Sequence, residues 1–125
     1  MKLLKNANVY TPAPLGKQDV LIEGEKVLRI AEEIRGYEGL PDVEVYDLAG
    51  KTLVPAYIDL HVHITGGGGE QGPASRVPES SLSTFFKNGI TTVVGLLGTD
   101  GITRSLENLV AKARALIEEG MTVYT

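Results

Sequence analysis

Polar and apolar side chains alternate along residues 54–64, the most informative stretch of the chain. Side chains two positions apart in a strand share a face, so Asp59, His61 and His63 form one polar row. The opposite row is apolar and consists of Ile58, Leu60, Val62 and Ile64. This alternation predicts a strand that leads directly into the four consecutive glycines at 66–69.

The N-terminal part of the chain contains short apolar runs separated by turn residues. Two of these runs flank Gly24-Glu25, a two-residue connection with glycine first, which favours a hairpin. Residues 43–48 alternate and predict another strand, whereas the prolines and glycine of residues 11–16 predict a loop. We expect a small β-sandwich domain at residues 1–54. A domain of about 50 residues buries little apolar surface, so it should pack on something else.

The first helix is predicted at residues 78–87, after a long loop. Pro78 suits the first turn of a helix, and Asn88-Gly89 suits its end. The apolar face of this helix is predicted to consist of Leu82, Phe85 and Phe86.

Residues 90–97 form a near-continuous apolar run, typical of strands in parallel sheets that are covered on both faces. A second helix is predicted from the N-cap Ser105 to Gly120. Its apolar positions, spaced by three and four residues, are Leu106, Leu109, Val110, Ala113, Leu116 and Ile117. A further strand begins at residues 121–125, so the order is β-α-β-α-β, and right-handed crossovers make the sheet parallel.

These elements predict an α/β fold in which residues 55–125 form the first βα units of a TIM-type (β/α)8 barrel. A complete barrel needs about 250 residues. An open parallel sheet of three strands would leave an apolar edge unpaired. We therefore expect the barrel to be incomplete in this chain and interpret the chain as the N-terminal part of a barrel enzyme.

The two histidines of the chain predict a metal site. Imidazoles at positions i and i+2 of a strand lie about 6–7 Å apart at Cα, so both rings can reach one ion. Neutral imidazole is a common zinc ligand. The alternative is an ordinary pair of surface or core histidines. Asp59 on the same face, as a partner that orients a histidine, and the glycine run that follows favour the metal site.

Composition narrows the classes of partner. The chain is 42% hydrophobic and 22% charged, which is typical of a globular protein. Its net charge is −4 without a basic cluster, which argues against nucleic acid and anionic membranes. The absence of cysteine excludes thiolate metal sites and fits a cytoplasmic location. The glycine run lacks the ending of a phosphate-binding P-loop.

Residues 55–63 resemble the first-strand signature of the amidohydrolase superfamily. Residues 66–79 and 93–100 are similar to the isoaspartyl dipeptidase family in particular, and Arg104 and the helix at 111–116 agree with it. The resemblance covers essentially all 125 residues. One departure is Ala56, which replaces the usual glycine and would strain the backbone if the position required a positive φ.

This resemblance implies hydrolysis of the isopeptide bond of β-aspartyl dipeptides by a zinc-activated hydroxide, with two zinc ions in the complete active site. His61 and His63 would hold the more buried zinc, which makes one partial site in this chain. Glu70 would bind the α-ammonium group of the substrate, Gly68 would contribute a backbone contact, and Thr99 would contact the carboxylate end. The general base and the other ligands are expected beyond Thr125, so this chain alone should be inactive.

The resemblance also implies a cytoplasmic zinc metallopeptidase of protein repair or degradation. Its partner would be a small β-aspartyl dipeptide, with no nucleic acid and no membrane, and the full-length protein should form a homo-oligomer. One alternative is another amidohydrolase, of the dihydroorotase or hydantoinase type, which would act on a cyclic amide. The other is a truncated, non-catalytic fragment that binds metal weakly.

Overall fold

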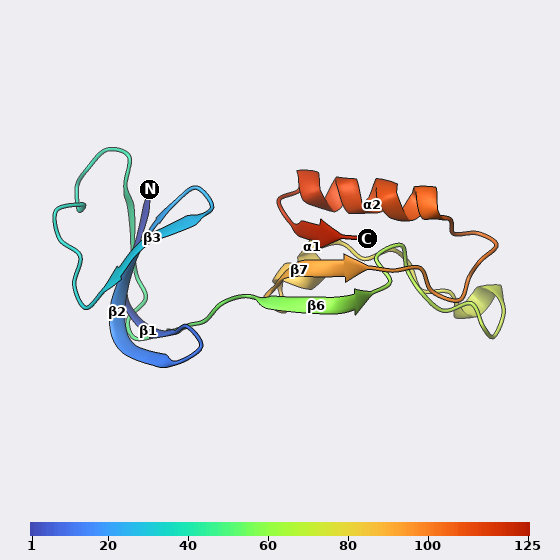
Figure 1. Ribbon diagram of the computed structural model, residues 1–125, viewed down its shortest axis with the longest axis horizontal. Helices are drawn as coiled ribbons and strands as arrows, with labels where there is room; N and C mark the ends of the chain where they lie inside the picture. The colour runs from blue at the N-terminus through green and yellow to red at the C-terminus, as the bar shows by residue number, and fades with distance from the viewer. The chain divides into compact units, whose positions relative to one another are not determined.

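The structure, a computed structural model, describes all 125 residues and divides the chain into two compact units (Figure 1). The first unit is Met1–Pro55 and the second is Ala56–Thr125. Each unit has apolar clusters of its own. The first unit is built from strands and the second from alternating strands and helices, so the predicted α/β class is confirmed. No helix has both the length and the apolar character needed to cross a membrane.

The first unit is a five-stranded, β-sandwich-like sheet. Its strands are β1 (Lys2–Tyr10), β2 (Pro14–Glu23), β3 (Lys26–Ala31), β4 (Glu44–Asp47) and β5 (Thr52–Leu53). The order is β3-β2-β1-β4, and β5 also pairs with β1. Strands β4 and β5 run parallel to β1, whereas β2 is antiparallel to both β1 and β3. The predicted hairpin at Gly24-Glu25 is confirmed, because Glu23 pairs with Lys26 across it.

The loop predicted at residues 11–16 is shorter in the structure, because β2 already begins at Pro14. Proline is tolerated as the first residue of a strand, where its missing N–H removes no essential hydrogen bond. The turn is confined to residues before Pro14, and the backbone N–H of Thr11 donates to the carbonyl oxygen of Ala13 at 3.0 Å.

Asp19 is a buried carboxylate within the first unit, only 3% exposed. Its two oxygens accept hydrogen bonds from the backbone N–H groups of Asn6 and Ile34, each at 3.0 Å. The ammonium group of Lys5 lies 3.7 Å away. Since an unpaired buried N–H group is costly, Asp19 stabilises the irregular backbone of β1 and the segment that follows β3.

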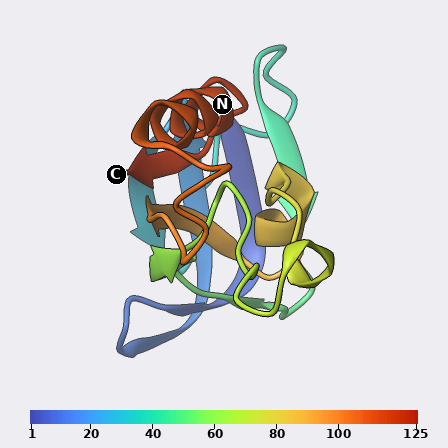
Figure 2. The ribbon, with the colours of Figure 1, turned by 90° about the vertical axis from the view of Figure 1, so that its right-hand side faces the viewer.

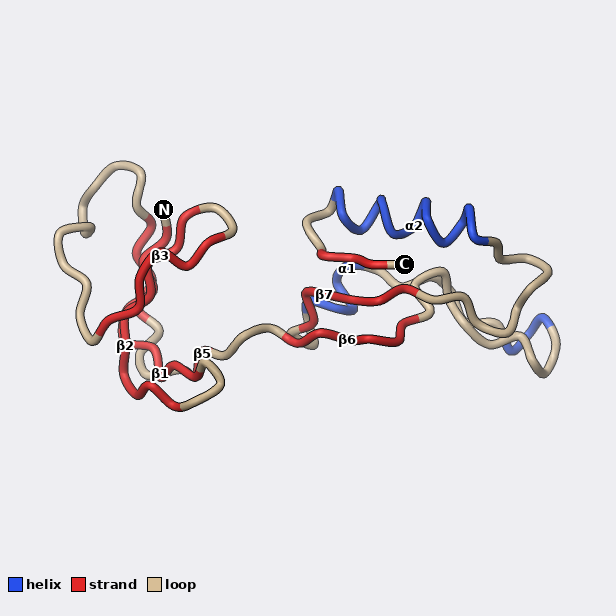
Figure 3. The backbone as a smooth tube through the Cα atoms, viewed as in Figure 1, coloured by secondary structure: helices blue, strands red, loops and turns tan.

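The second unit begins the predicted series of βα units. Its elements are β6 (Tyr57–Val62), the 3-10 helix η1 (Pro73–Ser75), α1 (Leu82–Phe86), β7 (Ile90–Gly95), α2 (Leu106–Glu118) and β8 (Thr122–Tyr124). The strands form one sheet in the order β6-β7-β8, and each neighbouring pair is parallel (Figure 3). The predicted parallel sheet is therefore confirmed.

Both helices contribute to one apolar core. Helix α2 packs on β8, as the view along α2 in Figure 2 shows, and α1 packs on β7. The buried core residues are Ile64, Phe85, Val93, Leu109, Ala113, Leu116, Met121 and Val123. Ser105 caps α2 as predicted, since its Oγ accepts a hydrogen bond from the backbone N–H of Asn108 at 3.2 Å. The core thus fixes the sheet and the start of α2, which carry the candidate site.

Helix α1 is shorter than the helix predicted at 78–87, and Pro78 does not begin it. The residues before α1 have no regular secondary structure, and the backbone N–H of Ser80 donates to the carbonyl oxygen of Ile64 at 3.1 Å. Ser81 is the N-cap residue of the observed helix. A local helix-start signal was therefore overridden by a backbone contact with a distant part of the chain.

Several apolar side chains that the sequence pattern grouped into faces are exposed. Their exposed fractions run from 40% to 70%, and they are Ile58, Leu60, Phe86, Leu106, Val110 and Ile117. The prediction that Phe86 faces the core is wrong, whereas Phe85 beside it is buried. On α2, the exposed apolar residues flank the buried Leu109 and Leu116, because the sheet covers only part of the apolar stripe.

Ala56 does not have the positive φ that would make it strained. The non-glycine residues with positive φ are Asn6 and Ala49. Alanine in place of the usual glycine at this position therefore carries no left-handed backbone strain.

Candidate functional site

The carboxyl ends of β6 and β7 lie at the same edge of the sheet, and a long loop leaves each of them. The first loop, residues 63–81, follows β6, and the second, residues 96–105, follows β7. The two strands stay paired up to this edge, because the backbone N–H of Leu96 donates to the carbonyl oxygen of Val62 at 2.8 Å. The residues predicted for the site lie on β6 or on these loops: His61, His63, Gly68, Glu70 and Thr99.

The two imidazole rings meet at the end of β6. Their Nε2 atoms are 3.2 Å apart and the ring centroids are 5.3 Å apart. Two nitrogens bound to one tetrahedral zinc ion at about 2.0–2.1 Å would be separated by about 3.3 Å. The spacing of His61 and His63 therefore fits two ligands of a single zinc ion.

His63 is positioned by close packing. Its Nδ1 atom is buried and has no hydrogen-bond partner within the chain. A Cβ atom on Gly98 would lie 2.3 Å from this nitrogen, so a side chain at position 98 would displace the ring. The sequence patterns assigned no contact to Gly98, and its contact with His63 becomes visible only in the folded chain.

Asp59 shares the polar row with the histidines but does not contact a ring nitrogen. Its Oδ1 accepts a hydrogen bond from the backbone N–H of His61 at 3.1 Å. No group of three or more His, Cys, Asp or Glu side chains comes together in the chain. The candidate metal ligands that the structure brings together are therefore the two imidazoles.

Gly68, Glu70 and Thr99 come together from the two loops. The hydroxyl of Thr99 donates a 2.6 Å hydrogen bond to the carboxylate of Glu70 and lies 3.4 Å from the carbonyl oxygen of Gly68. This hydrogen bond from Thr99 is the largest cause that lowers the pKa of Glu70 below its ordinary value. Glu70 is exposed, so this oriented carboxylate is available to a cationic group of a ligand.

Glycine is required in the first loop where the backbone passes close to itself. Gly66 and Gly68 have positive φ values of 90° and 70°. A Cβ atom would lie 2.2 Å from the carbonyl oxygen of Val77 at Gly66, and 2.3 Å from that of Ser75 at Gly68. The glycines thus allow a tight loop that presents Glu70 at the site.

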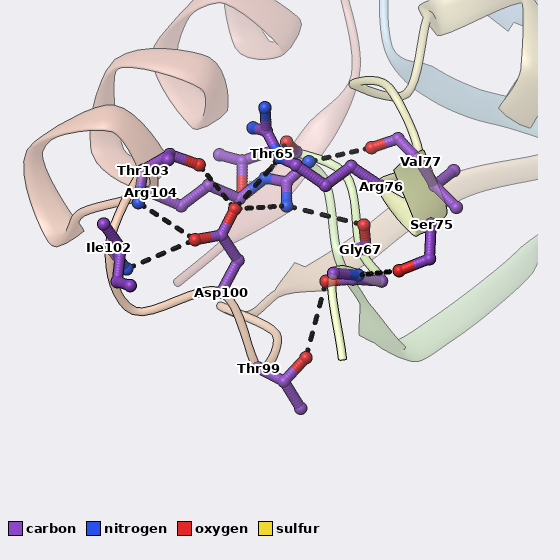
Figure 4. A network of polar contacts seen from close by, with 12 residues as sticks. Thr65, Gly67, Ser75, Arg76, Val77, Thr99, Asp100, Ile102, Thr103 and Arg104 are labelled. Atoms are coloured by element: carbon purple, nitrogen blue, oxygen red, sulfur yellow. Dashed lines mark hydrogen bonds and ion pairs between the residues drawn. The ribbon is translucent and has the colours of Figure 1, made fainter. Parts of the chain in front are cut away.

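Arg104 connects the two loops from inside the structure, and it is only 7% exposed. Figure 4 shows its guanidinium group donating to three carbonyl oxygens of the first loop. These belong to Thr65 at 2.8 Å, Val77 at 2.8 Å and Gly67 at 3.4 Å. The guanidinium also lies 3.3 Å from the carboxylate of Asp100 in the second loop. The sequence patterns assigned no role to Arg104.

Asp100 organises the second loop. One oxygen accepts hydrogen bonds from the backbone N–H groups of Ile102 at 3.2 Å and Thr103 at 2.9 Å, and the other accepts from the Thr103 hydroxyl. Nε of Arg76 lies 3.1 Å from this second oxygen. The hydrogen bonds from Thr103 and Ile102, with the charge of Arg76, lower the pKa of Asp100 to about 2. Asp100 is therefore ionised at any pH near neutrality.

Two solved structures of one protein resemble the chain over nearly its whole length. Beta-aspartyl dipeptidase from Fervidobacterium islandicum AW-1 has a TM-score of 0.89 and 51% identity, over 98% of this chain and 33% of that one. Its complex with a beta-Asp-Leu dipeptide has a TM-score of 0.87 and 50% identity, over 98% and 31%. This chain matches the N-terminal portion of the beta-aspartyl dipeptidases, in the amidohydrolase superfamily. The resemblance predicted from the motifs is confirmed.

A dihydroorotase and a hydantoinase are more distantly similar to this chain. Dihydroorotase from Staphylococcus aureus is 31% identical over 123 residues, which is 98% of this chain and 27% of the relative. D-Hydantoinase from Thermus sp. has a TM-score of 0.62 and 27% identity, over 89% and 23%. The chain therefore spans about a quarter to a third of the length of these proteins. No family model matches the chain.

Proposed function

We propose that the full-length protein containing this chain is a zinc-dependent hydrolase of β-aspartyl dipeptides. The observation that carries this proposal is the placement of an oriented carboxylate, Glu70, at the same sheet edge as a histidine pair whose spacing fits zinc. The similar protein from F. islandicum, in complex with a beta-Asp-Leu dipeptide, supports this substrate class.

His61 and His63 would hold the zinc ion through their Nε2 atoms. Zinc bound there would lower the pKa of a water molecule and polarise the carbonyl group of the substrate. Catalytic zinc sites commonly use about three protein ligands. Two imidazoles alone are therefore expected to bind zinc weakly, and we propose that residues 1–125 alone are inactive. The remaining ligands, the second zinc and the general base would come from the part that the longer relatives have in addition.

Glu70 would bind the free α-ammonium group of the β-aspartyl residue. A hydrogen bond between an ammonium group and a carboxylate is shorter and stronger than a neutral one, so this contact selects a free amino terminus. Thr99 orients the carboxylate and lowers its pKa, so Glu70 is charged at neutral pH and loses its charge only in acid. The backbone of Gly68 and the hydroxyl of Thr99 would complete this part of the site, with Thr99 towards the carboxylate end of the substrate.

The proposal is tested with the zinc-loaded full-length protein and three substrates: β-Asp-Leu, α-Asp-Leu and dihydroorotate. We expect kcat/KM for β-Asp-Leu to exceed both other values by at least about 100-fold, because a site built around specific polar contacts rejects ligands that cannot make them. Removal of metal by a chelator should abolish hydrolysis, and added zinc should restore it. No hydrolysis of β-Asp-Leu by the zinc-loaded protein would refute the proposal.

A cyclic amidase of the dihydroorotase or hydantoinase type is the second candidate, favoured by the dihydroorotase and hydantoinase relatives. The exposed carboxylate of Glu70 argues against dihydroorotate, because this substrate carries no ammonium group that could pair with it. A preference for dihydroorotate in the same assay would favour this second candidate.

Replacing Glu70 with Gln should weaken substrate recognition and leave the zinc content unchanged. A hydrogen bond to a charged group contributes about 1.5–3 kcal/mol, so kcat/KM for β-Asp-Leu should fall by about 10- to 100-fold. Steady-state kinetics and metal analysis of the full-length protein measure both quantities. Glu118→Gln, at an exposed position near the end of α2, is the control and should have no effect. Loss of zinc from Glu70→Gln would contradict the role of Glu70 in substrate binding.

We further propose, from the sequence and the resemblance, that the full-length protein is cytoplasmic and forms a homo-oligomer. Its substrates would be isomerised dipeptides released during protein degradation. Cell fractionation and the mass of the native assembly in solution would test the first two points.

A further inference from the structure

Two charged side chains of the second loop, Arg104 and Asp100, connect it to the first loop: Arg104 donates to carbonyl oxygens of that loop, and Asp100 contacts Arg76 (Figure 4). We propose that this pair is a positioning device for substrate recognition: it fixes Glu70 relative to Thr99 and so maintains selection for a free ammonium group. The inference rests on the proposed function of Glu70 and adds two residues to it.

Arg104 closes the base of the first loop. Its acceptors in Gly67 and Val77 lie on the two sides of the segment that contains Glu70. These two residues are also joined directly, because the backbone N–H of Val77 donates to the carbonyl oxygen of Gly67 at 2.8 Å. The guanidinium fork can satisfy several acceptors at once because it has five N–H donors in one plane. The segment between Gly67 and Val77 is thus anchored at both ends by one side chain.

The fit of Arg104 against the first loop is close. A Cβ atom on Gly66 would lie 2.7 Å from Nη2 of Arg104, in addition to its conflict with the carbonyl oxygen of Val77. A glycine in the first loop and a buried arginine from the second loop therefore occupy the same limited space. This packing leaves the loop little freedom to shift while Arg104 stays in place.

Asp100 fixes the backbone of the second loop next to Thr99. It follows Thr99 directly, and its carboxylate holds the backbone of Ile102 and Thr103. Arg76, which comes from the first loop, contacts the same Asp100 oxygen as Arg104 does. Two cationic side chains thus link Asp100 to the first loop, and the position of Thr99 opposite Glu70 follows from these links.

Arg104 makes no hydrogen bond with Glu70 or Thr99, so it acts through the loops and is a positioning residue. A purely structural role would make its loss reduce all activities equally. A positioning role predicts a selective loss of discrimination between substrates with and without a free ammonium group.

The test uses the zinc-loaded full-length protein, with β-Asp-Leu and its N-acetylated form as substrates. Arg104→Met should lower the ratio of kcat/KM for the free and acetylated forms by at least about tenfold, mainly by raising KM for the free form, because a displacement of about 1 Å is costly. Zinc content should stay unchanged. Arg104→Lys should give an intermediate ratio, since one ammonium group cannot satisfy all the acceptors. The control Arg114→Met, at an exposed position of α2, should retain the ratio.

An unchanged ratio in folded Arg104→Met would overturn the inference, even if overall activity fell. If this variant does not fold, Asp100→Asn tests the same link, and an unchanged ratio there would also overturn it. Failure of the proposed function is seen separately, as a wild-type protein that does not prefer the free form. If the wild-type protein shows no such preference, hydrogen exchange of residues 66–77 tests whether Arg104 anchors the first loop. Faster exchange in Arg104→Lys than in wild type supports the anchoring, and equal exchange refutes it.

Discussion

Replacement of His63 by alanine is expected to remove bound zinc from the full-length protein and to lower kcat for β-Asp-Leu by about 1,000-fold or more, because water activation and carbonyl polarisation both depend on the metal. The same result is expected for His61→Ala, since the Nε2 atoms of the two rings are only 3.2 Å apart and fit a single ion. Each variant removes one of the two imidazoles that the chain contributes. Zinc per protein chain, measured by atomic emission, and steady-state kinetics check the prediction.

Asp59→Asn is the matched control for the histidine variants. Asp59 lies in the same polar row of β6, but its carboxylate contacts a backbone N–H group and no ring nitrogen. It should therefore keep its zinc and most of its activity. A His63→Ala protein with full zinc content and wild-type turnover would show that the zinc is held by other residues.

The arrangement of the second unit could be predicted from the sequence because its signals are local. A period of two residues specifies β6, and the order of strands and helices specifies parallel pairing. The start of α1 could not be predicted in this way. Pro78 is a local helix-start signal, but the residues around it are not helical, and the backbone N–H of Ser80 donates to the carbonyl oxygen of the distant Ile64. A contact between residues distant in sequence leaves no trace in local periodicity.

In the candidate site too, only the relations between residues close in sequence could be predicted. The neighbouring positions of His61 and His63 follow from their spacing of two residues in the predicted strand, although β6 already ends at Val62 and His63 is the first residue of the loop. The approach of Thr99 to Glu70 does not follow from any spacing, because it depends on two loops that meet at one sheet edge. Both residues were predicted from the resemblance alone. Arg104 is the extreme case. It stands just before the N-cap of α2, where sequence reasoning assigns nothing to a cation, and its acceptors are up to 39 residues away.

Gly98 is another residue whose role only the folded chain reveals, and Gly98→Ala is expected to reduce zinc binding without unfolding the protein. The new Cβ atom would lie 2.3 Å from Nδ1 and 2.9 Å from Cε1 of His63, so the ring must rotate away. Rotation of His63 separates its Nε2 from that of His61 and spoils the ligand spacing. Because a misplacement of about 1 Å can cost about 100-fold, we expect kcat/KM for β-Asp-Leu to fall by about 100-fold or more, with zinc content reduced in parallel.

Gly101→Ala is the matched control, because this glycine lies in the same loop, lacks a positive φ and would meet no atom within 4 Å. It should retain both zinc and activity, which separates the steric effect on His63 from a general effect of alanine in the loop. Gly98 also lacks a positive φ, so any loss in Gly98→Ala arises from the contact with the imidazole and not from backbone strain. Circular dichroism should show the same fold for both variants. A Gly98→Ala protein with full zinc content and wild-type kcat/KM would mean that His63 can bind the metal in another orientation, and the present ring position would then be dispensable.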